Sequence, residues 1–263
     1  MTAEQTVLAS IAGEMETISG HLSFYYKNLV TGEEFGVQEN DACLAASVIK
    51  FPLLLHVLTR AHRGEISLQD RLTVENWEKV PSCGGLNQFT GPVEADIATL
   101  CRLMIVLSDN TATNKLFRFC GLEQTNEAFR EMGLEKTVVR RLLFDSEASA
   151  RGLQNTICPR EMGMLLEKLY RKEFVSEEVS ELAMDILLHQ QIDHKLDGKL
   201  CGEVPIAHKT GEDDRLSNDV GIVFAEQPFV ICFAGQDTEV YYWEDLMRRG
   251  TYDLVQAQRM DHT

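Results

Sequence analysis

Basic residues are scarce in this chain of 263 residues. It has 25 Lys and Arg against 41 Asp and Glu, which gives a formal net charge of −16 at pH 7. A nucleic-acid-binding surface needs clustered cations to neutralise phosphates, so the composition argues against a nucleic-acid partner. An anionic membrane surface is disfavoured for the same reason, and the acidic excess itself indicates solubility.

The sequence also has no long hydrophobic run. No stretch approaches the roughly 18 apolar residues of a membrane span. The N-terminus has no basic segment, no uninterrupted apolar segment and no cleavage site of a secretion signal. The sequence as it stands predicts a cytoplasmic protein, although a protein whose leader had been removed would read the same. We expect a monomer or a weak homo-oligomer.

Cysteine pairs and metal-binding clusters are missing as well. The seven cysteines form no Cys-x-x-Cys pair, and none stands with histidine at zinc spacing. Most lie in apolar runs, such as Cys101 within 100–107 and Cys232 within 229–234. This placement is typical of reduced core residues. The sequence implies no metal and no organic cofactor.

What is present is a globular composition with 44% hydrophobic residues, enough for one large core or two interleaved subdomains. Apolar spacing predicts helices at both ends of the chain and a β-hairpin after the first. Turn residues divide the rest into a mostly helical middle and a final group of strands. The predicted helices cover 3–19, 46–63, 94–107, 111–120, 159–172, 177–190 and 239–258, and the strands lie within 21–37, 206–210, 220–225 and 229–235.

This order predicts an α+β fold in which the two ends of the chain build one sheet. Residues 1–44 and 191–263 would form a discontinuous subdomain, a sheet with the N- and C-terminal helices. Residues 45–190 would form an all-helical subdomain inserted into it. No Pro/Gly/Ser-rich linker separates the parts, so we expect two subdomains around one cleft rather than independent domains.

The first residues that indicate chemistry stand at the start of the predicted helix 46–63. Ser47 and Lys50 are three residues apart, so their side chains share a helix face. A hydroxyl becomes a good nucleophile when a neighbouring base takes its proton, and a lysine can be that base if burial lowers its pKa. Ser-x-x-Lys alone more often joins a solvated serine to a surface lysine. Here the apolar residues around the pair indicate a buried helix.

Two further polar motifs follow. Ser108 and Asn110 belong to Ser-Asp-Asn, which on its own is best explained as the N-cap of the next helix, although a cap can also carry function. Lys209, Thr210 and Gly211 end a predicted strand. A lysine there can bind a carboxylate, and a glycine allows close approach to the backbone. Alone, this motif indicates a strand end with an exposed lysine.

Together and in this order, the three motifs resemble the signature of class A β-lactamases and penicillin-binding proteins. The resemblance extends to residues 108–114 and 219–223 and to the order of elements, and so spans almost the entire chain. It implies the β-lactamase-like fold, an antiparallel sheet with flanking helices and an inserted helical subdomain. It also implies a serine hydrolase that opens β-lactam amides through an acyl-enzyme and takes a small-molecule amide or ester.

The resemblance implies a role in acylation for four residues. Ser47 would attack the amide carbonyl, and Lys50 would be the acylation base, directly or through water. Ser108 would pass a proton to the leaving nitrogen. The backbone N–H groups of Ser47 and Glu212 would form the oxyanion hole.

The resemblance assigns substrate binding to other motif residues of this chain. Asn110 would hold the substrate's side-chain amide. Lys209 and Thr210, beside Gly211, would engage the substrate's carboxylate, and Lys209 would also set the electric field near Ser108.

The sequence departs from the family at the deacylation step. Class A enzymes carry a water-activating glutamate in a Glu-x-x-Leu-Asn loop, and residues 130–160 lack that pattern. Glu147 is the best candidate for this base, with Asn155 to position it, although a surface loop acid is the simpler interpretation. The loop resembles that of a less-studied subgroup of class A-like serine hydrolases.

Two other departures concern charge and redox state. The acids Glu212-Asp213-Asp214 stand where the family has small residues. They would repel a carboxylate substrate, with Arg215 as a partial offset, unless they form only a solvated turn. Cys101 stands where many secreted members have one half of a disulfide, but its partner position is Leu54. The family bridge is therefore not expected here.

Three functions are compatible with these patterns. A β-lactamase would both acylate and deacylate. A hydrolase of the same fold would act on an ester, peptide or other amide with little β-lactam turnover, and the departures after Gly211 and in the loop favour it. An inactive homologue would bind a peptidoglycan-like ligand or a protein partner, and the intact motif residues argue against it.

Overall fold

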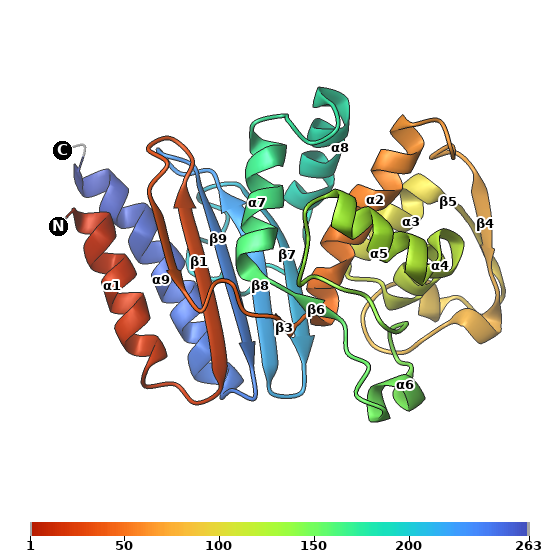
Figure 1. Ribbon diagram of the computed structural model, residues 1–263, viewed down its shortest axis with the longest axis horizontal. Helices are drawn as coiled ribbons and strands as arrows, with labels where there is room; N and C mark the ends of the chain where they lie inside the picture. Colours follow the sequence, from red (N-terminus) through yellow and green to blue (C-terminus); the bar gives the residue numbers. More distant parts are fainter. Residues whose placement is uncertain (1, 262–263) are drawn as a thin grey trace.

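The computed structural model describes residues 2–261, and its elements follow the predicted order (Figure 1). One five-stranded antiparallel sheet dominates one half of the molecule, with strand order β2-β1-β9-β8-β7. Its strands are β1 (His21–Asn28), β2 (Glu34–Val37), β7 (Ile206–Asp213), β8 (Leu216–Val223) and β9 (Phe229–Gln236). The two ends of the chain do build one sheet, because Phe24 of β1 pairs with Phe233 of β9.

The terminal helices cover one face of this sheet. Helices α1 (Ala3–Met15) and α9 (Val240–Asp261) lie side by side there, at the left of Figure 1. Thr2 begins α1 as the N-cap of a complete capping box. Under the helices lies a core rich in aromatic residues, including Phe24, Phe233 and Trp243. This core holds α1 and α9 against that face of the sheet.

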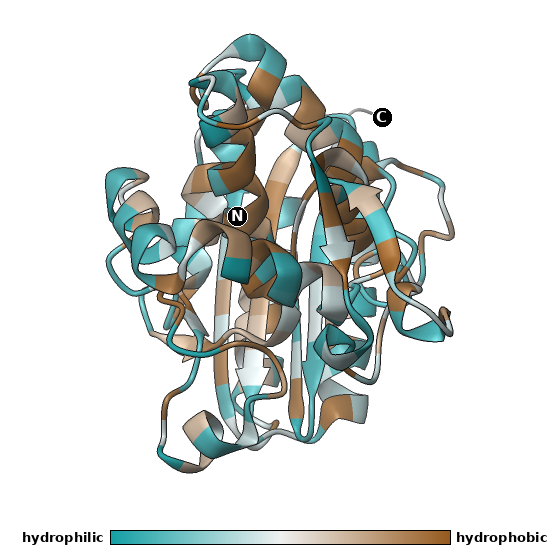
Figure 2. Cartoon of the chain, turned by 90° about the vertical axis from the view of Figure 1, so that its right-hand side faces the viewer, coloured by the Kyte–Doolittle hydropathy of each residue, from teal (hydrophilic) through white to brown (hydrophobic). Residues whose placement is uncertain are grey.

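The opposite face of the sheet carries the helical half of the molecule. Helix α7 (Pro159–Tyr170) packs on β1, β8 and β9, and α8 (Glu177–Leu188) packs on β7. Beyond them lie α2 (Lys50–His62), α3 (Ile97–Val106), α4 (Asn110–Cys120), α5 (Leu122–Glu131) and the short α6 (Ser146–Ala150). Helix α2 is the buried centre of this half, with ten consecutive buried residues from Lys50 to Thr59. In Figure 2 hydrophobic and hydrophilic residues alternate along the surrounding helices, as expected for elements with one buried side.

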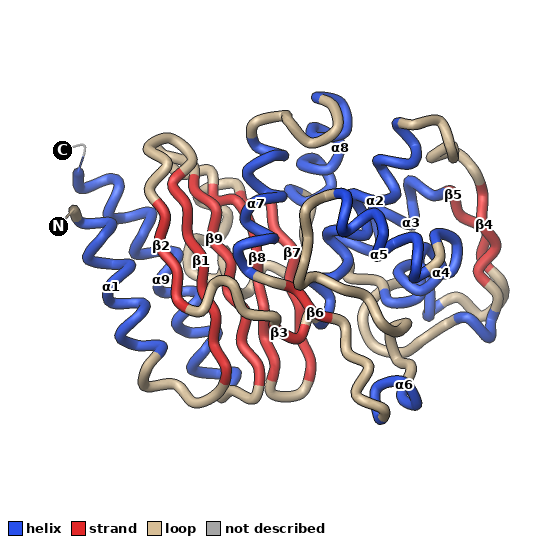
Figure 3. Tube along the Cα trace, viewed as in Figure 1, coloured by secondary structure: helices blue, strands red, loops and turns tan. Residues whose placement is uncertain are grey.

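The middle of the chain is mostly helical, but it also contains short strands that the sequence pattern does not predict (Figure 3). Strands β4 (Arg71–Val74) and β5 (Val93–Asp96) pair with each other, and β3 (Cys43–Leu44) pairs with β6 (Thr156–Ile157). Such strands are too short to show a period of two. Three 3₁₀ turns complete the middle: η1 (Ala46–Ile49), η2 (Asn76–Glu78) and η3 (Leu86–Gln88).

The edge strand β7 is longer than the sequence predicts. The strand was expected to stop at Thr210, but it continues to Asp213 because its last three residues pair with β8. This extension places the acids at 212 and 213 on the strand that borders the helical half. Among residues 2–261 no helix is long and apolar enough to cross a membrane.

Candidate active site

Ser47 lies on η1, directly before α2 and against β7 and β8. Ala46 ahead of it has φ = 41°, an uncommon conformation for a residue with a side chain. Lys50 opens α2 and is fully buried. As predicted, the two side chains share one face, with the Lys50 Nζ 2.8 Å from the Ser47 Oγ.

The Lys50 amine is surrounded by oxygen atoms. Its Nζ lies 2.7 Å from the Ser108 carbonyl oxygen, 2.9 Å from the Ser108 Oγ and 2.7 Å from the Asn110 Oδ1. Burial, together with the nearby Lys209 ammonium, holds the pKa of Lys50 well below its usual range. A neutral Lys50 amine can accept the Ser47 proton, which is the requirement for a serine nucleophile.

Ser108 connects two buried lysines. It lies on the turn between α3 and α4 with φ = 52° and is almost fully buried. Its Oγ is 2.9 Å from the Lys50 Nζ and 3.1 Å from the Lys209 Nζ. Strained backbone of this kind persists where the surrounding structure fixes it, and it is common at functional sites. The Ser108 hydroxyl thus links the two buried lysine amines.

Lys209 is not an exposed lysine at a strand end. Its side chain is fully buried, and the Nζ donates to the Thr210 carbonyl oxygen at 2.9 Å as well as to Ser108. Burial lowers its pKa to about 7, although the Asp219 carboxylate opposes this shift. The site therefore contains two lysines whose amines lose protons more readily than a lysine in water.

The N-cap interpretation of Ser-Asp-Asn is also confirmed, and the residue that forms the cap is the central one, Asp109. Asp109 caps α4 by accepting from the Ala112 N–H at 2.8 Å. Its second carboxylate oxygen accepts from the Gly85 and Leu86 N–H groups at 2.7 and 2.8 Å. One buried aspartate therefore holds both the helix that carries Asn110 and the loop around Cys83.

Gly211 allows β7 to approach the nucleophile closely. A Cβ at this position would lie 3.0 Å from the Ala45 carbonyl oxygen and 3.2 Å from the Ser47 nitrogen. Since β7 is an edge strand, its backbone can face the cleft next to Ser47. This arrangement agrees with a glycine needed for close approach. The oxyanion hole of Ser47 and Glu212 N–H groups stays a prediction.

The sequence suggested that Arg215 partly offsets the acids after Gly211, but the structure gives this arginine another partner. The Arg215 guanidinium donates to the Asp237 carbonyl oxygen at 2.7 Å. The Glu212 carboxylate instead pairs with the Lys195 Nζ at 3.0 Å and lies 3.4 Å from the His194 Nε2. Sequence reasoning missed Lys195, a fully buried residue in a segment without a predicted element.

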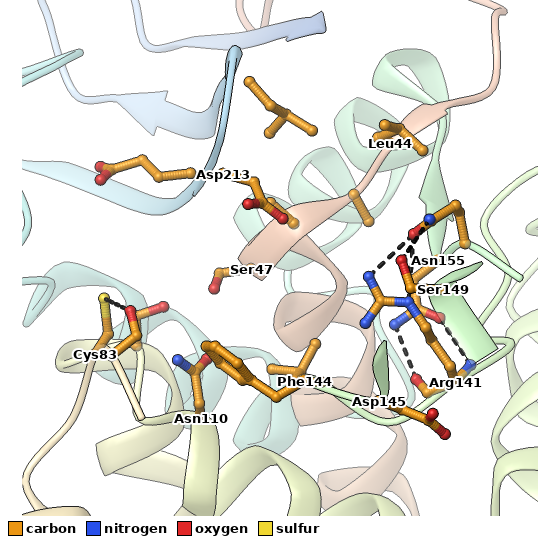
Figure 4. Close-up of a pocket in the computed structure, with 18 of the residues that line it drawn as sticks. Leu44, Ser47, Cys83, Asn110, Arg141, Phe144, Asp145, Ser149, Asn155 and Asp213 are labelled. Carbon is orange, nitrogen blue, oxygen red and sulfur yellow. Dashed lines mark hydrogen bonds between the residues drawn. The ribbon is translucent and has the colours of Figure 1, made fainter. Parts of the chain in front are cut away.

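A cleft of about 650 Å³ lies in front of Ser47 (Figure 4). Several of its walls were not predicted from the sequence. Phe144 comes from the loop before α6, where it has φ = 63° and is 50% exposed. The cleft is lined by Leu44, Ala45, Ala46, Ser47, Ser82, Cys83, Ser108, Asn110, Arg141, Leu143, Phe144, Asp145, Ser146, Ser149, Gln154, Asn155, Ile192, Thr210, Glu212, Asp213 and Leu216.

The structure does not bring Glu147, the predicted deacylation base, to the cleft. Glu147 lies exposed on α6 and does not line the cleft. Asn155 does line the cleft, but it does not position Glu147. Its side chain bonds the main chain of Arg140 and Arg141, accepting from their N–H groups at 2.8 and 3.1 Å. The helical phase of α6 turns Ala148 inward and Glu147 outward.

One group of side chains in the described residues resembles a metal site in composition. Ligand atoms of His194, Glu212 and Glu244 lie within 4.8 Å of one another. The Lys195 Nζ lies 3.0 Å from Glu212 and 3.9 Å from Glu244. The Lys195 ammonium already pairs with these carboxylates, so the three side chains do not fit a metal ion well.

The fold, with a serine beside a buried lysine and a second serine that bridges to another lysine, is that of the β-lactamase-like serine hydrolase family. The chain belongs to the beta-lactamase enzyme family, whose model matches residues 5–250. A curated relative, the beta-lactamase regulatory protein BlaB of Streptomyces cacaoi, is 32% identical over 135 residues. That match covers 51% of this chain and 43% of the relative, so the chain spans less than half of that protein's length.

Solved structures of similar fold cover almost the whole chain. A β-lactamase from Sphaerobacter thermophilus has a TM-score of 0.88 and 23% identity, covering 97% of this chain and 98% of its own. PBP-A has the same TM-score at 27% identity, covering 97% and 96%. A PBP-A mutant determined as an acyl-enzyme complex with penicillin G has a TM-score of 0.86 and 27% identity, covering 98% and 96%. The fold is that of the class A β-lactamases.

Proposed function

We propose that this protein is an acylating serine hydrolase, which opens β-lactam and related amides by forming an ester on Ser47 and releases the acyl group slowly. The observation that carries this proposal is the buried Lys50 amine, 2.8 Å from the Ser47 Oγ and with a lowered pKa. A base of this kind in contact with a hydroxyl is the requirement for nucleophilic catalysis.

The acylation step follows from the contacts around Lys50. The Ser47 Oγ attacks the carbonyl carbon while its proton passes to the Lys50 Nζ. The oxyanion would be held by the Ser47 and Glu212 N–H groups. When the C–N bond breaks, the leaving nitrogen takes the Ser108 hydroxyl proton, and Lys50 returns a proton to the Ser108 Oγ, 2.9 Å away. A protonated Lys209, 3.1 Å from that oxygen, stabilises its transient negative charge.

Slow release is supported by what surrounds Ser47 and Lys50. In residues 2–261 the side-chain hydrogen bonds of these two residues involve hydroxyl, carbonyl and amide oxygens, and none involves a carboxylate. The facing loop contributes Leu143 and Phe144 to the cleft, while Glu147 lies outside it. Without a carboxylate to activate water, hydrolysis of the ester loses a general-base contribution that is typically 10²–10⁴-fold.

The relatives are consistent with an acylating site. PBP-A is 27% identical to this chain, and a mutant of it forms an acyl-enzyme complex with penicillin G. The substrate of the present protein is accordingly proposed to be a small amide or ester, with β-lactams as reagents that reach the same serine.

The test is intact-protein mass over time after mixing with a chromogenic cephalosporin, while the colour change is followed. We expect a lasting adduct with little turnover. Ser47→Ala should form none, and Lys50→Met should lose labelling by penicillin and by a fluorophosphonate. Ser149→Ala is the matched control, since Ser149 lines the cleft but its Oγ accepts a hydrogen bond from Gln154.

Two results would overturn parts of the proposal. Rapid colour change with only a transient adduct would establish β-lactamase turnover and disprove slow release. Absence of any adduct with either reagent would disprove Ser47 as an acylated nucleophile.

A further inference from the structure

Asp213 faces the cleft from the end of β7. Side chains alternate along a strand, so Asp213 lies on the same face as Lys209 and Gly211, both of which approach the Ser47 site. Glu212 lies on the other face, where Lys195 and His194 pair with it. Asp213 itself lines the cleft and is exposed. Figure 4 shows it across the cleft from Phe144, with Ser47 between them.

The carboxylate of Asp213 has no cationic partner in the described residues. Its Oδ1 accepts only from the Asp214 N–H, at 2.8 Å. Asp145, a second acid on the cleft wall, accepts from the Ala148 N–H as a helix cap. The one arginine that lines the cleft, Arg141, donates to the Gln154 side chain and to a backbone carbonyl. The carboxylate of Glu212 is the only acid of the lining set that has a lysine partner.

The buried lysines do not reverse this balance. The Lys50 Nζ is bound by oxygens of Ser47, Ser108 and Asn110, and the Lys209 Nζ by oxygens of Ser108 and Thr210, so neither amine pairs with Asp213. A substrate group that extends past Thr210 along β7 therefore meets an uncompensated carboxylate. Low-dielectric walls strengthen the field of such a charge in a cleft.

The opposite wall offers an apolar surface. Phe144 is 50% exposed, and the loop that carries it is anchored because Asn114 bonds both main-chain groups of Leu143, at 2.8 and 2.9 Å. A half-exposed aromatic ring on a fixed loop is suited to contact with an apolar or aromatic acyl group.

We propose that this cleft selects an amide or ester with an apolar acyl group beside Phe144 and a cationic, not anionic, group beside Asp213. The inference rests on the proposed acylation of Ser47. In this proposal a single residue, Asp213, selects the charge of the substrate group beside it. Asp213 is therefore a specificity-determining residue.

Three forms of one compound test it. Benzylpenicillin carries a carboxylate, its methyl ester is neutral at that position, and its diethylaminoethyl ester is a cation, while the aromatic acyl group is unchanged. The measurement is the second-order rate of acyl-adduct formation by intact mass at low ionic strength. We expect the cation to react about tenfold faster than the anion, with the neutral ester between them, and the ratio to shrink in high salt.

Asp213→Asn deletes one charge and should therefore lower the ratio of the cation's rate to the anion's rate by about threefold to fivefold. Asp214→Asn is the matched control, because the neighbouring acid is exposed but does not line the cleft, and it should keep the preference. Fastest reaction of the anion, or equal behaviour of the two variants, would overturn the inference while leaving acylation intact. If neither the methyl ester nor a neutral fluorophosphonate modifies Ser47, the proposed function fails, and this inference fails with it.

Discussion

Gly211 lies against the backbone of Ser47, and a methyl group added to it would stand 3.2 Å from the Ser47 nitrogen. The backbone conformation at Gly211 is extended, so alanine would be accepted there without torsional strain. The added atom must push β7 and η1 apart by a few tenths of an ångström. The spacing between the nucleophile and the edge strand is therefore set by the absence of one side chain.

We predict that Gly211→Ala lowers the acylation rate of Ser47 by about tenfold or more, since donors aimed at a developing oxyanion lose strength when displaced. Burst kinetics with a chromogenic cephalosporin measures this. Gly85→Ala serves as the control, because a Cβ there would meet only the Leu107 side chain, at 4.0 Å. Equal rates for the two variants would show that the Gly211 contact does not govern acylation.

Lys209 makes stability depend on pH in a defined direction. Its pKa falls from 10.5 to about 7 on folding. Between these values the unfolded chain binds more protons, so the free energy of unfolding rises with pH. From pH 7 to 9 this group should contribute about 2 kcal/mol of increase. Urea unfolding at both pH values should show this rise in the natural protein and a smaller one in Lys209→Met, whereas identical slopes would contradict it.

Asp109 joins a helix cap to the loop at the cleft. Asp109→Ala removes three hydrogen bonds of a buried carboxylate, to the N–H groups of Ala112, Gly85 and Leu86. We expect a loss of about 2–4 kcal/mol in the free energy of unfolding, measured by urea denaturation. Asp96→Ala, which removes only the cap of α3 at Thr99, should cost about 1 kcal/mol. A similar small loss in both variants would show that the loop contacts contribute little.

The lifetime of the acyl-enzyme should not depend on Glu147, because this residue lies outside the cleft. Glu147→Gln should therefore leave the decay of the adduct unchanged, as followed by intact mass. Leu143→Glu should shorten the lifetime by tenfold or more, since it places a carboxylate in the cleft on a backbone fixed by Asn114. Leu143→Gln has the same size without the base and should not shorten it. Faster decay in the glutamine variant would mean that solvent access, and not a base, limits release.

The contacts that the sequence predicted correctly lie at the ends of locally recognisable elements. Ser47 and Lys50 share a helix face by spacing alone, and Ser108 adjoins a cap whose composition marks it. The order of the strands in the large sheet and of the longer helices, except α5, followed from apolar spacing in the same way. These features depend on short-range physics, which a single sequence records.

The features that the sequence could not predict depend on contacts between distant segments. Lys195 meets Glu212 only because the loop before β7 folds beneath that strand. Glu147 was a plausible base by position, but a five-residue helix has no periodicity from which its inward face can be read. Phe144 gave no signal at all, since its backbone conformation becomes visible only in the folded loop.

The pairing of β1 with β9 has a consequence for how the chain acquires its structure. The hairpin of β1 and β2 is made early during synthesis, but the neighbour that covers the other edge of β1 comes almost last. Until residue 236 is available, that edge exposes unpaired backbone groups and an aromatic face, which are the features that promote aggregation. Folding is accordingly expected to be slow and dependent on non-local contacts, so truncation within β9 should abolish solubility rather than merely trim the protein.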